Sequence, residues 1–382
     1  MAQRHKKFVG AGVVVFLLLL PLPQRADAGI RFEHSLQVME EYDDNVRREE
    51  KGEIQDLLLR FLYRAEGGIR FDARQSLSFR LQVGGKKYLS LLDRQGLEGD
   101  ALIGKGEGSW QRFLTDKVGL KADLSLQGRL IRDFAERSFE NNGNLGLFFL
   151  LPQEFDLALS GGYLFFDYND TTVERFHFVG DRYLLSLARP LGASFATGVA
   201  YAFQRRFFSF EAVTLREPEG EGFDTIVFDP LGESRRDLIH EVTLYLQYAR
   251  RIVLRVGYTF QRDGSNSYRG DFVNHRIQVN FSKRIFAGFT FLALGKFQFK
   301  VYDDPAVVMR TIAIDGDTEE PTEVLQRFEN QNENLSSLEV KLVHPVGKDL
   351  SLDLKYGFFF LLQEGENTYL RNIVGIGLRK RF

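Results

Sequence analysis

The segment from Thr368 to Phe382, "TYLRNIVGIGLRKRF", decides the fold. Its apolar and polar residues alternate, which is the period of a β-strand with two different faces. One parity carries Leu370, Val374, Ile376, Leu378 and Phe382, and the other carries Arg371, Arg379 and Arg381. Chain termini that are not held in a sheet are usually poorly ordered. A run that alternates up to Phe382 therefore predicts a strand that is paired to its last residue.

The same alternation recurs along the chain. It is clear in "VGLKADLSLQGRL" (118–130), in "HRIQVNFSK" (275–283) and in "DLSLDLKYGF" (349–358). A helix would instead place apolar residues three and four positions apart. These segments are therefore predicted to be strands.

In total the pattern predicts sixteen strands, with boundaries good to about 3 residues. They are 31–44, 54–65, 75–87, 99–112, 117–131, 143–151, 155–168, 177–188, 194–205, 237–249, 252–262, 271–283, 288–302, 335–344, 349–362 and 369–382. Connections after even-numbered strands are mostly short. Those after odd-numbered strands are longer and polar, above all the acidic loops 206–236 and 303–334. Short turns at one end and long loops at the other are typical of transmembrane β-barrels.

Composition supports strands and excludes several classes of protein. The chain has 382 residues, with 36 Phe, 36 Gly, only 9 Pro and no Cys, and its formal charge is −2. The lack of cysteine excludes a disulfide framework, and the near-neutral charge indicates no nucleic-acid partner. Mean hydropathy is −0.22. Such a value is compatible with a membrane barrel, because alternating strands average to near-neutral hydropathy.

The first 28 residues are predicted to be a secretory signal peptide. A basic head precedes an apolar run from Phe8 to Leu20, and an A-x-A site ends at Ala28, so cleavage is expected before Gly29. The alternative is a membrane anchor, but the run is shorter than the roughly 20 residues that a spanning helix needs. No cysteine follows it, which excludes a bacterial lipoprotein. Residues 29–382 are predicted to form a single transmembrane β-barrel domain.

A soluble β-sandwich is the main alternative fold, because its strands also alternate. Sandwich strands average about 5–6 residues, whereas these run to about a dozen, enough for a tilted strand to cross a bilayer. The apolar parity is also rich in aromatic residues near strand ends: Tyr42, Tyr63, Phe149, Phe165, Phe203, Tyr248, Tyr258 and Phe299. We therefore predict an all-β fold, a closed antiparallel up-and-down transmembrane barrel of about 16 strands, within a range of about 14 to 18.

The last nine residues, "VGIGLRKRF", resemble the closing strand of Gram-negative outer-membrane proteins, which typically end in Phe after alternating apolar residues. Val374, Ile376, Leu378 and Phe382 match that pattern, and Lys380 departs from it. The resemblance implies an outer-membrane location with both termini periplasmic. It also implies recognition of these four residues by the barrel assembly machinery, contact with outer-membrane lipid, and a homo-oligomer as one arrangement open to the chain.

A second segment, "LQVMEEYDDNV" (36–46), resembles the opening strand of porin-like barrels found in exopolysaccharide and surface-assembly systems. This resemblance leaves open a periplasmic or surface partner.

Candidate motifs for enzymatic chemistry are weak. The five histidines after residue 28 share the apolar parity, so no Ser/His/acid group can be assembled on one lumen-facing surface. "GDALIGKG" (99–106) lacks the Ser or Thr of a phosphate-binding loop at Gly106, and "DGDTEE" (315–320) lacks the glycine of an EF-hand. No enzyme activity, metal or cofactor is therefore expected.

The polar parity carries many charges, and these must face water, because an Arg or Lys facing lipid at midplane costs about 2–4 kcal/mol. The residues predicted to line the lumen are Arg60, Arg80, Lys121, Asp123, Arg129, Arg255, Arg276, Lys296, Lys355 and Arg371. Basic residues exceed acidic ones on this parity, which favours anions in a narrow aqueous passage. An alternative interpretation is a lattice of cross-strand salt bridges that fills a structural barrel.

These observations predict a porin-like channel for passive diffusion of small polar or anionic solutes. The alternative is a non-porin outer-membrane barrel that serves as scaffold or conduit for surface polysaccharide, lipoprotein or a threaded partner protein. Whether loops 206–236 and 303–334 plug the pore or bind a partner stays open at this point.

Overall fold

The computed structural model describes residues 29–44, 55–89, 101–131, 136–169, 176–216, 227–268, 270–304, 306–312, 323–329, 334–362 and 369–382. The predicted signal peptide lies outside these residues, as does the acidic segment 315–320.

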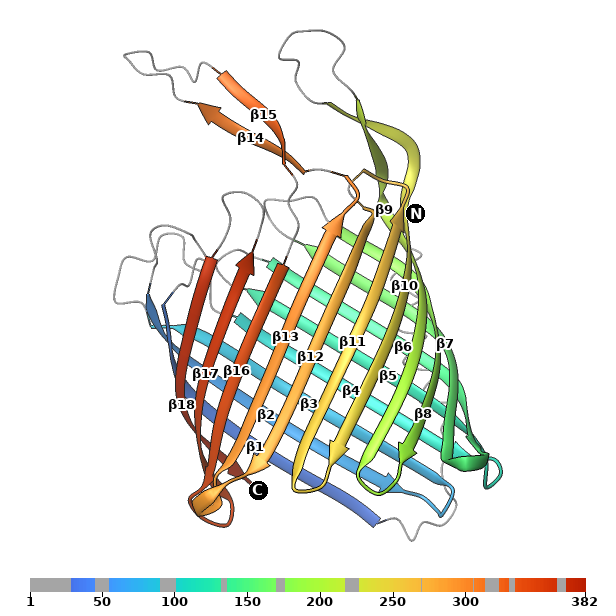
Figure 1. Ribbon diagram of the computed structural model, residues 1–382, viewed down its shortest axis with the longest axis vertical. Helices are drawn as coiled ribbons and strands as arrows, with labels where there is room; N and C mark the ends of the chain where they lie inside the picture. The colour runs from blue at the N-terminus through green and yellow to red at the C-terminus, as the bar shows by residue number, and fades with distance from the viewer. Residues whose placement is uncertain are drawn as a thin grey trace.

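Sixteen antiparallel strands form a closed barrel, in the order β1-β18-β17-β16-β13-β12-β11-β10-β9-β8-β7-β6-β5-β4-β3-β2 (Figure 1). The predicted fold class is confirmed. Apart from the pairs β13–β16 and β1–β18, every pair of neighbours in the barrel is consecutive in sequence. The short turns gather at one end of the barrel and the long connections at the other (Figure 1). Within the described ranges, no helix is long and apolar enough to cross a membrane.

The barrel strands are β1 (Gly29–Asp43), β2 (Asp56–Arg70), β3 (Gln75–Tyr88), β4 (Ala101–Phe113), β5 (Val118–Ile131), β6 (Glu136–Leu151), β7 (Phe155–Asn169), β8 (Phe176–Leu191), β9 (Phe195–Arg216), β10 (Val227–Ala249), β11 (Ile252–Ser265), β12 (Phe272–Arg284), β13 (Thr290–Tyr302), β16 (Asn334–Pro345), β17 (Leu350–Leu362) and β18 (Tyr369–Arg381). Single turns of 3-10 helix, η1 (Pro152–Glu154) and η2 (Phe286–Gly288), occupy two of the short connections. β14 (Ala306–Ile312) and β15 (Glu323–Glu329) pair with each other as a separate antiparallel hairpin.

The barrel closes where β18 pairs with β1, and this boundary is called the seam below. The register runs from Ser35 opposite Arg381 to Asp43 opposite Ile373. Beyond it, the Phe382 N–H donates to the His34 carbonyl at 3.0 Å, so the chain is paired to its last residue. The Phe382 ring stacks on His34 with centroids 4.9 Å apart. The Lys380 ammonium lies 4.9 Å from that ring's centroid, a favourable cation–π position for a lysine that departs from the apolar pattern.

Two glycines on the inner face of β18 allow the seam to form. A Cβ on Gly377 would lie 2.6 Å from the Val38 carbonyl oxygen and 3.0 Å from the Met39 Cβ. A Cβ on Gly375 would lie 3.0 Å from the Glu41 Cγ. At Gly377 the contact is with backbone that the ladder holds, so it cannot relax. At Gly375 the contact is with the Glu41 side chain, which is held by its ion pairs with Arg60 and Lys355. The glycines leave the space into which the side chains of β1 extend.

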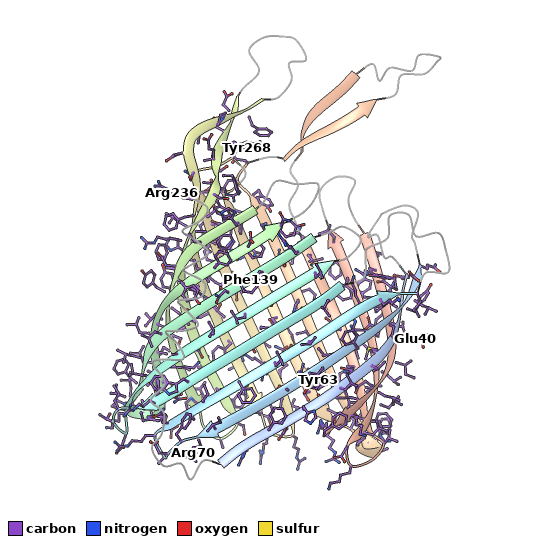
Figure 2. The ribbon with its side chains drawn as sticks, turned by 180° about the vertical axis from the view of Figure 1, so that it is seen from behind. Glu40, Tyr63, Arg70, Phe139, Arg236 and Tyr268 are labelled. Carbon is purple, nitrogen blue, oxygen red and sulfur yellow. The ribbon has the colours of Figure 1, made fainter. Side chains whose placement is uncertain are left out.

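The two parities of each strand meet different surroundings. On β18, Leu370, Val374, Ile376 and Leu378 are all more than half exposed, whereas Arg371 and Ile373 on the other parity are buried. Large apolar residues exposed on the outside occur on every barrel strand from β1 to β18, including Phe61, Leu145, Leu185 and Val256. Tyr63 and Phe139 mark this outer parity in Figure 2. A continuous apolar exterior of this kind is what hydrocarbon requires.

A few polar groups share the outer parity, and they bind one another. Arg205 on β9 forms a two-pronged ion pair with Asp181 on β8, with N–O distances from 2.6 to 3.1 Å. The Tyr163 hydroxyl donates to the Asn141 side-chain oxygen at 2.9 Å. On β9, Arg205 is the next outward residue after the segment 195–203. A tilted strand of that length can cross hydrocarbon of roughly 25 Å. The ion pair therefore lies at the edge of the apolar band.

The structure corrects the prediction at the two long loops. Residues 206–236 were expected to be a loop, but β9 and β10 continue through most of it, to Arg216 and from Val227. These extensions project beyond the barrel rim (Figure 1), with register shifts between Pro230 and Arg236. Outside a bilayer a hairpin needs no apolar outer face. The prediction relied on an alternating apolar face, so it ended both strands too close to the barrel. Residues 303–334 likewise contain the β14–β15 hairpin.

Strand β6 also begins earlier than predicted, at Glu136 and not near residue 143. Its first residues, "ERSFENN", are poor strand formers. Pairing with β5 and β7 on both sides outweighs that local preference.

Substitution of Gly377 by Val is expected to block closure, because the new side chain meets the backbone of β1. The fraction of refolded protein that migrates as the compact, unheated form in gel electrophoresis should fall strongly. Gly106→Val is the matched control, because no heavy atom lies within 4 Å of a Cβ built on Gly106. Equal folding of the two variants would contradict this account of the seam.

Candidate functional site

The space enclosed by the barrel is the candidate site. A cavity of ≈ 400 Å³ is lined by Arg64 of β2 and Leu292 of β13, although β1, β18, β17 and β16 lie between these strands in the sheet. On each strand, the side chains that share a face with these lining residues therefore point into the interior of the barrel.

The register places all ten predicted lumen residues on this inner parity. The pairs Arg60–Met39, Arg80–Glu66, Lys296–Gln278 and Lys355–Gly375 are representative. Their part in solute passage stays a prediction. The structure adds what parity could not give, namely which of the ten bind a carboxylate.

The first group of charges lies at the seam and is called the seam cluster: Glu41, Asp43, Arg60, Lys341, Asp353, Lys355, Arg371 and Arg379. The Asp353 Oδ2 accepts hydrogen bonds from Gln37 at 2.8 Å and from Arg379 at 2.6 Å, and lies 2.9 Å from the Lys341 Nζ. Glu41 binds Arg60 at 2.9 Å and Lys355 at 3.3 Å. The cluster joins β2, β1, β18, β17 and β16 across the closure.

Burial makes the seam cluster a structural element. The side chains of Glu41, Asp43 and Asp353 have no exposed area. Asp43 binds the Arg371 guanidinium through both carboxylate oxygens, with Nε distances of 2.9 and 3.1 Å. An enclosed carboxylate is tolerated only when such partners compensate the loss of water. Arg60, Lys355 and Arg371 are thus held by acids.

Smaller ion pairs line β2 to β5 and β10 to β12. The Arg80 guanidinium lies 3.0 Å from Glu66 and 3.5 Å from Glu107. Lys121 pairs with Asp123 at 3.0 Å, and Arg276 pairs with Glu241 at 2.5 Å. Apart from Glu241, these side chains are a third to a half exposed, so each pair contributes little stability. Their charges nevertheless compensate one another.

Four inward cations differ: Arg129 on β5, Arg182 on β8, Arg255 on β11 and Lys296 on β13. In the part of the chain that the structure describes, no carboxylate forms an ion pair with any of them. The Arg255 guanidinium lies 4.6 Å from the centroid of the Tyr245 ring. Arg182 lies between Gly162 and Gln204 in the sheet, and its Nε is enclosed. Uncompensated positive charge therefore lies on strands outside the seam cluster, from β5 to β13.

The long-loop end carries a further charged group that the sequence reasoning missed. Arg235 binds Asp237 through two hydrogen bonds of 2.9 and 3.0 Å, and Ser265 donates to the same carboxylate at 2.7 Å. The Arg235 guanidinium also lies 4.7 Å from the Phe208 ring, and Arg206 lies 4.9 Å from the Phe178 ring. Arg206, Phe208 and Arg235 fell in the predicted loop 206–236, where no face could be assigned. Figure 2 shows Arg236 and Tyr268 at this end.

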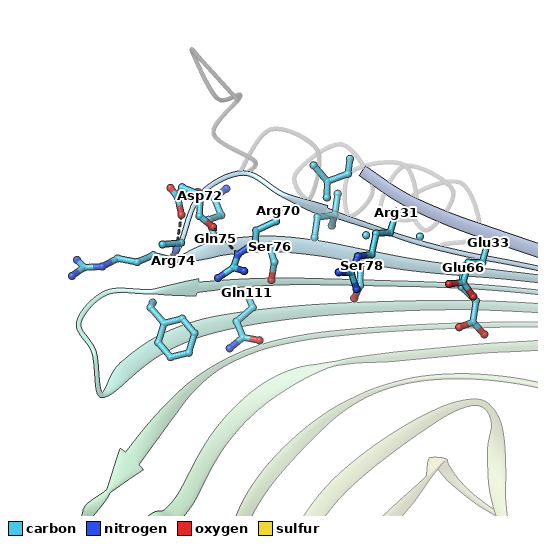
Figure 3. Close-up of a pocket in the computed structure, with 16 residues that line it drawn as sticks. Arg31, Glu33, Glu66, Arg70, Asp72, Arg74, Gln75, Ser76, Ser78 and Gln111 are labelled. Atoms are coloured by element: carbon cyan, nitrogen blue, oxygen red, sulfur yellow. Dashed lines mark hydrogen bonds between the residues drawn. The ribbon is translucent and has the colours of Figure 1, made fainter. Parts of the chain in front are cut away.

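The short-turn end opens into a wider cavity of ≈ 850 Å³ along β1 to β4 (Figure 3). Arg31 lies near Ser78, Arg70 lies near Ser76, and Glu33 lies beside Glu66 (Figure 3). The mixture of both charges with hydroxyl groups is a hydrated vestibule, with no single sign of charge. Glu66 was missed because its strand was predicted to end at residue 65, whereas β2 runs to Arg70.

The histidines lie on the outer parity. His240 and His275 bind the hydroxyl groups of Tyr201 and Tyr258, each at 2.7 Å. Ser209 Oγ lies 3.0 Å from His177 Nδ1, also on the outside. Among the described residues, no group of three or more His, Cys, Asp or Glu is arranged to hold a metal ion.

No protein-family model and no curated protein matches the sequence. Solved barrels that are similar include OccK2 (OpdF) of Pseudomonas aeruginosa in complex with glucuronate, at 11% identity over 93% of this chain and 98% of that chain, with a TM-score of 0.44. OccAB3 of Acinetobacter baumannii is 10% identical over 92% of this chain and 99% of that chain, with a TM-score of 0.44. A bacterial polysaccharide outer membrane secretin is 9% identical over 91% and 98%, with a TM-score of 0.41. This likeness carries no argument about solute or selectivity.

Neutralising the centre of the seam cluster is expected to destabilise the barrel. Asp353→Asn leaves Lys341 and Arg379 without their shared anion in an enclosed site, and should lower the free energy of unfolding by about 3 kcal/mol. This change in the free energy of unfolding is measured by urea unfolding in lipid vesicles, followed by the fluorescence of the single tryptophan, Trp110. Asp123→Asn, in an exposed pair, should cost less than about 1 kcal/mol. Losses of equal size would show that burial at the seam does not matter.

Proposed function

We propose that this protein is a porin-like channel of the outer membrane that lets small polar or anionic solutes diffuse passively. The observation that carries the proposal is a closed barrel of sixteen strands with charged side chains on its inner face. Barrels of 16 to 18 strands leave an aqueous passage between their walls. The described inner face offers charges and hydroxyl groups, which suit hydrated solutes.

The membrane location is supported by the outer face. Its exposed apolar residues extend over every strand of the barrel, far beyond the few hundred Å² of apolar patch that a soluble monomer exposes. Gly29, at the start of β1, and Phe382 both lie at the short-turn end. We propose that this end faces the periplasm.

Preference for anions would come from the cations that no acid compensates. A lumen cation bound to a carboxylate presents a dipole, whose field decays faster with distance than that of a single charge. Arg129, Arg182, Arg255 and Lys296, on strands outside the seam cluster, keep more of their field than the cations that bind an acid. In a narrow aqueous lumen with low-dielectric walls, such a field raises the local concentration of anions.

The scaffold or conduit is a second candidate, and one observation favours it. The extended β9–β10 ribbon and the β14–β15 hairpin project from the long-loop end (Figure 1). A periplasmic or surface partner that copurifies with the intact protein, and closed channels without that partner, would support this function over the channel.

The channel is tested by conductance and reversal potential in a planar bilayer under a KCl gradient. The unmodified protein should conduct and prefer chloride. Removing two uncompensated cations in the double variant Arg129→Gln, Lys296→Gln should shift the permeability ratio towards unity.

Arg112→Gln is the matched control, because Arg112 faces outward opposite Leu120 and should leave selectivity unchanged. Cation preference, or absence of conductance in the unmodified protein, would contradict the proposed function.

A further inference from the structure

The seam cavity, of ≈ 400 Å³, has more cationic than anionic groups around it. Its lining includes the cations Arg60, Arg64, Lys341, Lys355 and Arg379. The acids near it are Glu41, Glu339 and Asp353, so positive groups exceed negative ones by two. This is the composition of an anion site and not of a neutral lattice.

Burial decides which of these charges a solute would meet. Glu41 and Asp353 have no exposed side-chain area, whereas the side chains of Arg60 and Arg64 are 42% and 45% exposed. Glu339 is 34% exposed and also faces the cavity, but Glu41 and Asp353 lie behind Arg60 and Arg64 as seen from the lumen. They hold the cationic groups in place and leave these groups to face the water in the cavity.

Unused hydrogen-bond donors remain on these cations. A guanidinium has five N–H donors and an ammonium three, more than the acids beneath can accept. The Arg60 Nε is enclosed and has no hydrogen-bond partner among the described residues, so the donors that Arg60 offers to the cavity are on its terminal nitrogens. Among the residues that the structure describes, Arg64 has one weak ion pair, in which its Nε lies 4.0 Å from the Glu66 Oε1. Donors fixed in advance and facing a common space are the arrangement that binds an oxyanion with little loss of side-chain entropy.

We propose that the seam cavity binds a compact oxyanion with two negative charges, such as inorganic phosphate or a small dicarboxylate. Two charges match the excess of two cations, and several acceptor oxygens match the converging donors. The inference rests on the proposed function in one respect, because the anion reaches the cavity through the lumen. Bound there, it would slow the passage of other anions.

Inorganic phosphate and succinate, each added in turn to a channel in KCl at neutral pH, distinguish the two sources of such an anion. The one that fits should reduce the current in a saturable manner. Arg64→Gln should raise its half-saturating concentration about tenfold, because one charge-assisted hydrogen bond is lost. Arg64 has no role in the enclosed ion pairs at the seam, so this variant should fold.

Lys121→Gln is the matched control, since it removes one inward positive charge on β5, outside the cavity. It should leave the half-saturating concentration unchanged. An equal effect of both variants would mean that only the general charge of the lumen matters, and the proposal would fail.

Isothermal titration of the purified full-length protein in detergent with phosphate and with succinate measures binding without conductance. Saturable binding that Arg64→Gln weakens supports the site even in a closed channel. If neither anion gives a heat of binding, the proposed site is wrong. Conductance with chloride preference would still support the proposed function.

Discussion

The pairing of β18 with β1 is the constraint on which the rest of the structure depends. In hydrocarbon an unpaired strand edge leaves N–H and C=O groups with no partner, so a barrel that does not close cannot stay in the membrane. Closure here combines a backbone register that extends to Phe382, two glycines that make room for the side chains of β1, and enclosed ion pairs on the inner side. Each element serves the same boundary.

This use of charge at the seam shapes the electrostatics of the interior. The acids that stabilise closure compensate part of the positive charge next to them, and further positive field comes from side chains on strands outside the seam cluster. At the seam itself Glu41 and Asp353 are so enclosed that the cations, together with Glu339, form the surface. A structural lattice and a surface that attracts anions are therefore two sides of one cluster, and the two interpretations of the inner charges are compatible.

The alternating pattern was sufficient for most of the fold, since it fixed sixteen strands, their faces and the closing role of the last one. It failed where the physical cause of the pattern ends. The β9 and β10 extensions lie beyond the apolar band, where nothing demands an apolar face, and the polar start of β6 is held by its two neighbours. At these places neighbouring strands decide the structure, and a single segment carries little signal.

By itself the sequence determined the strands and which side chains face inward, because a period of two is a local property of an extended chain. It therefore predicted the ten inward charges. Only the tertiary structure decided which of them are compensated. Asp43 and Arg371 are 328 positions apart and become partners only when the barrel closes, whereas Arg129 and Lys296 form no ion pair with an acid of the described ranges. Ion pairing depends on distances that register and closure set, and no local pattern contains those distances.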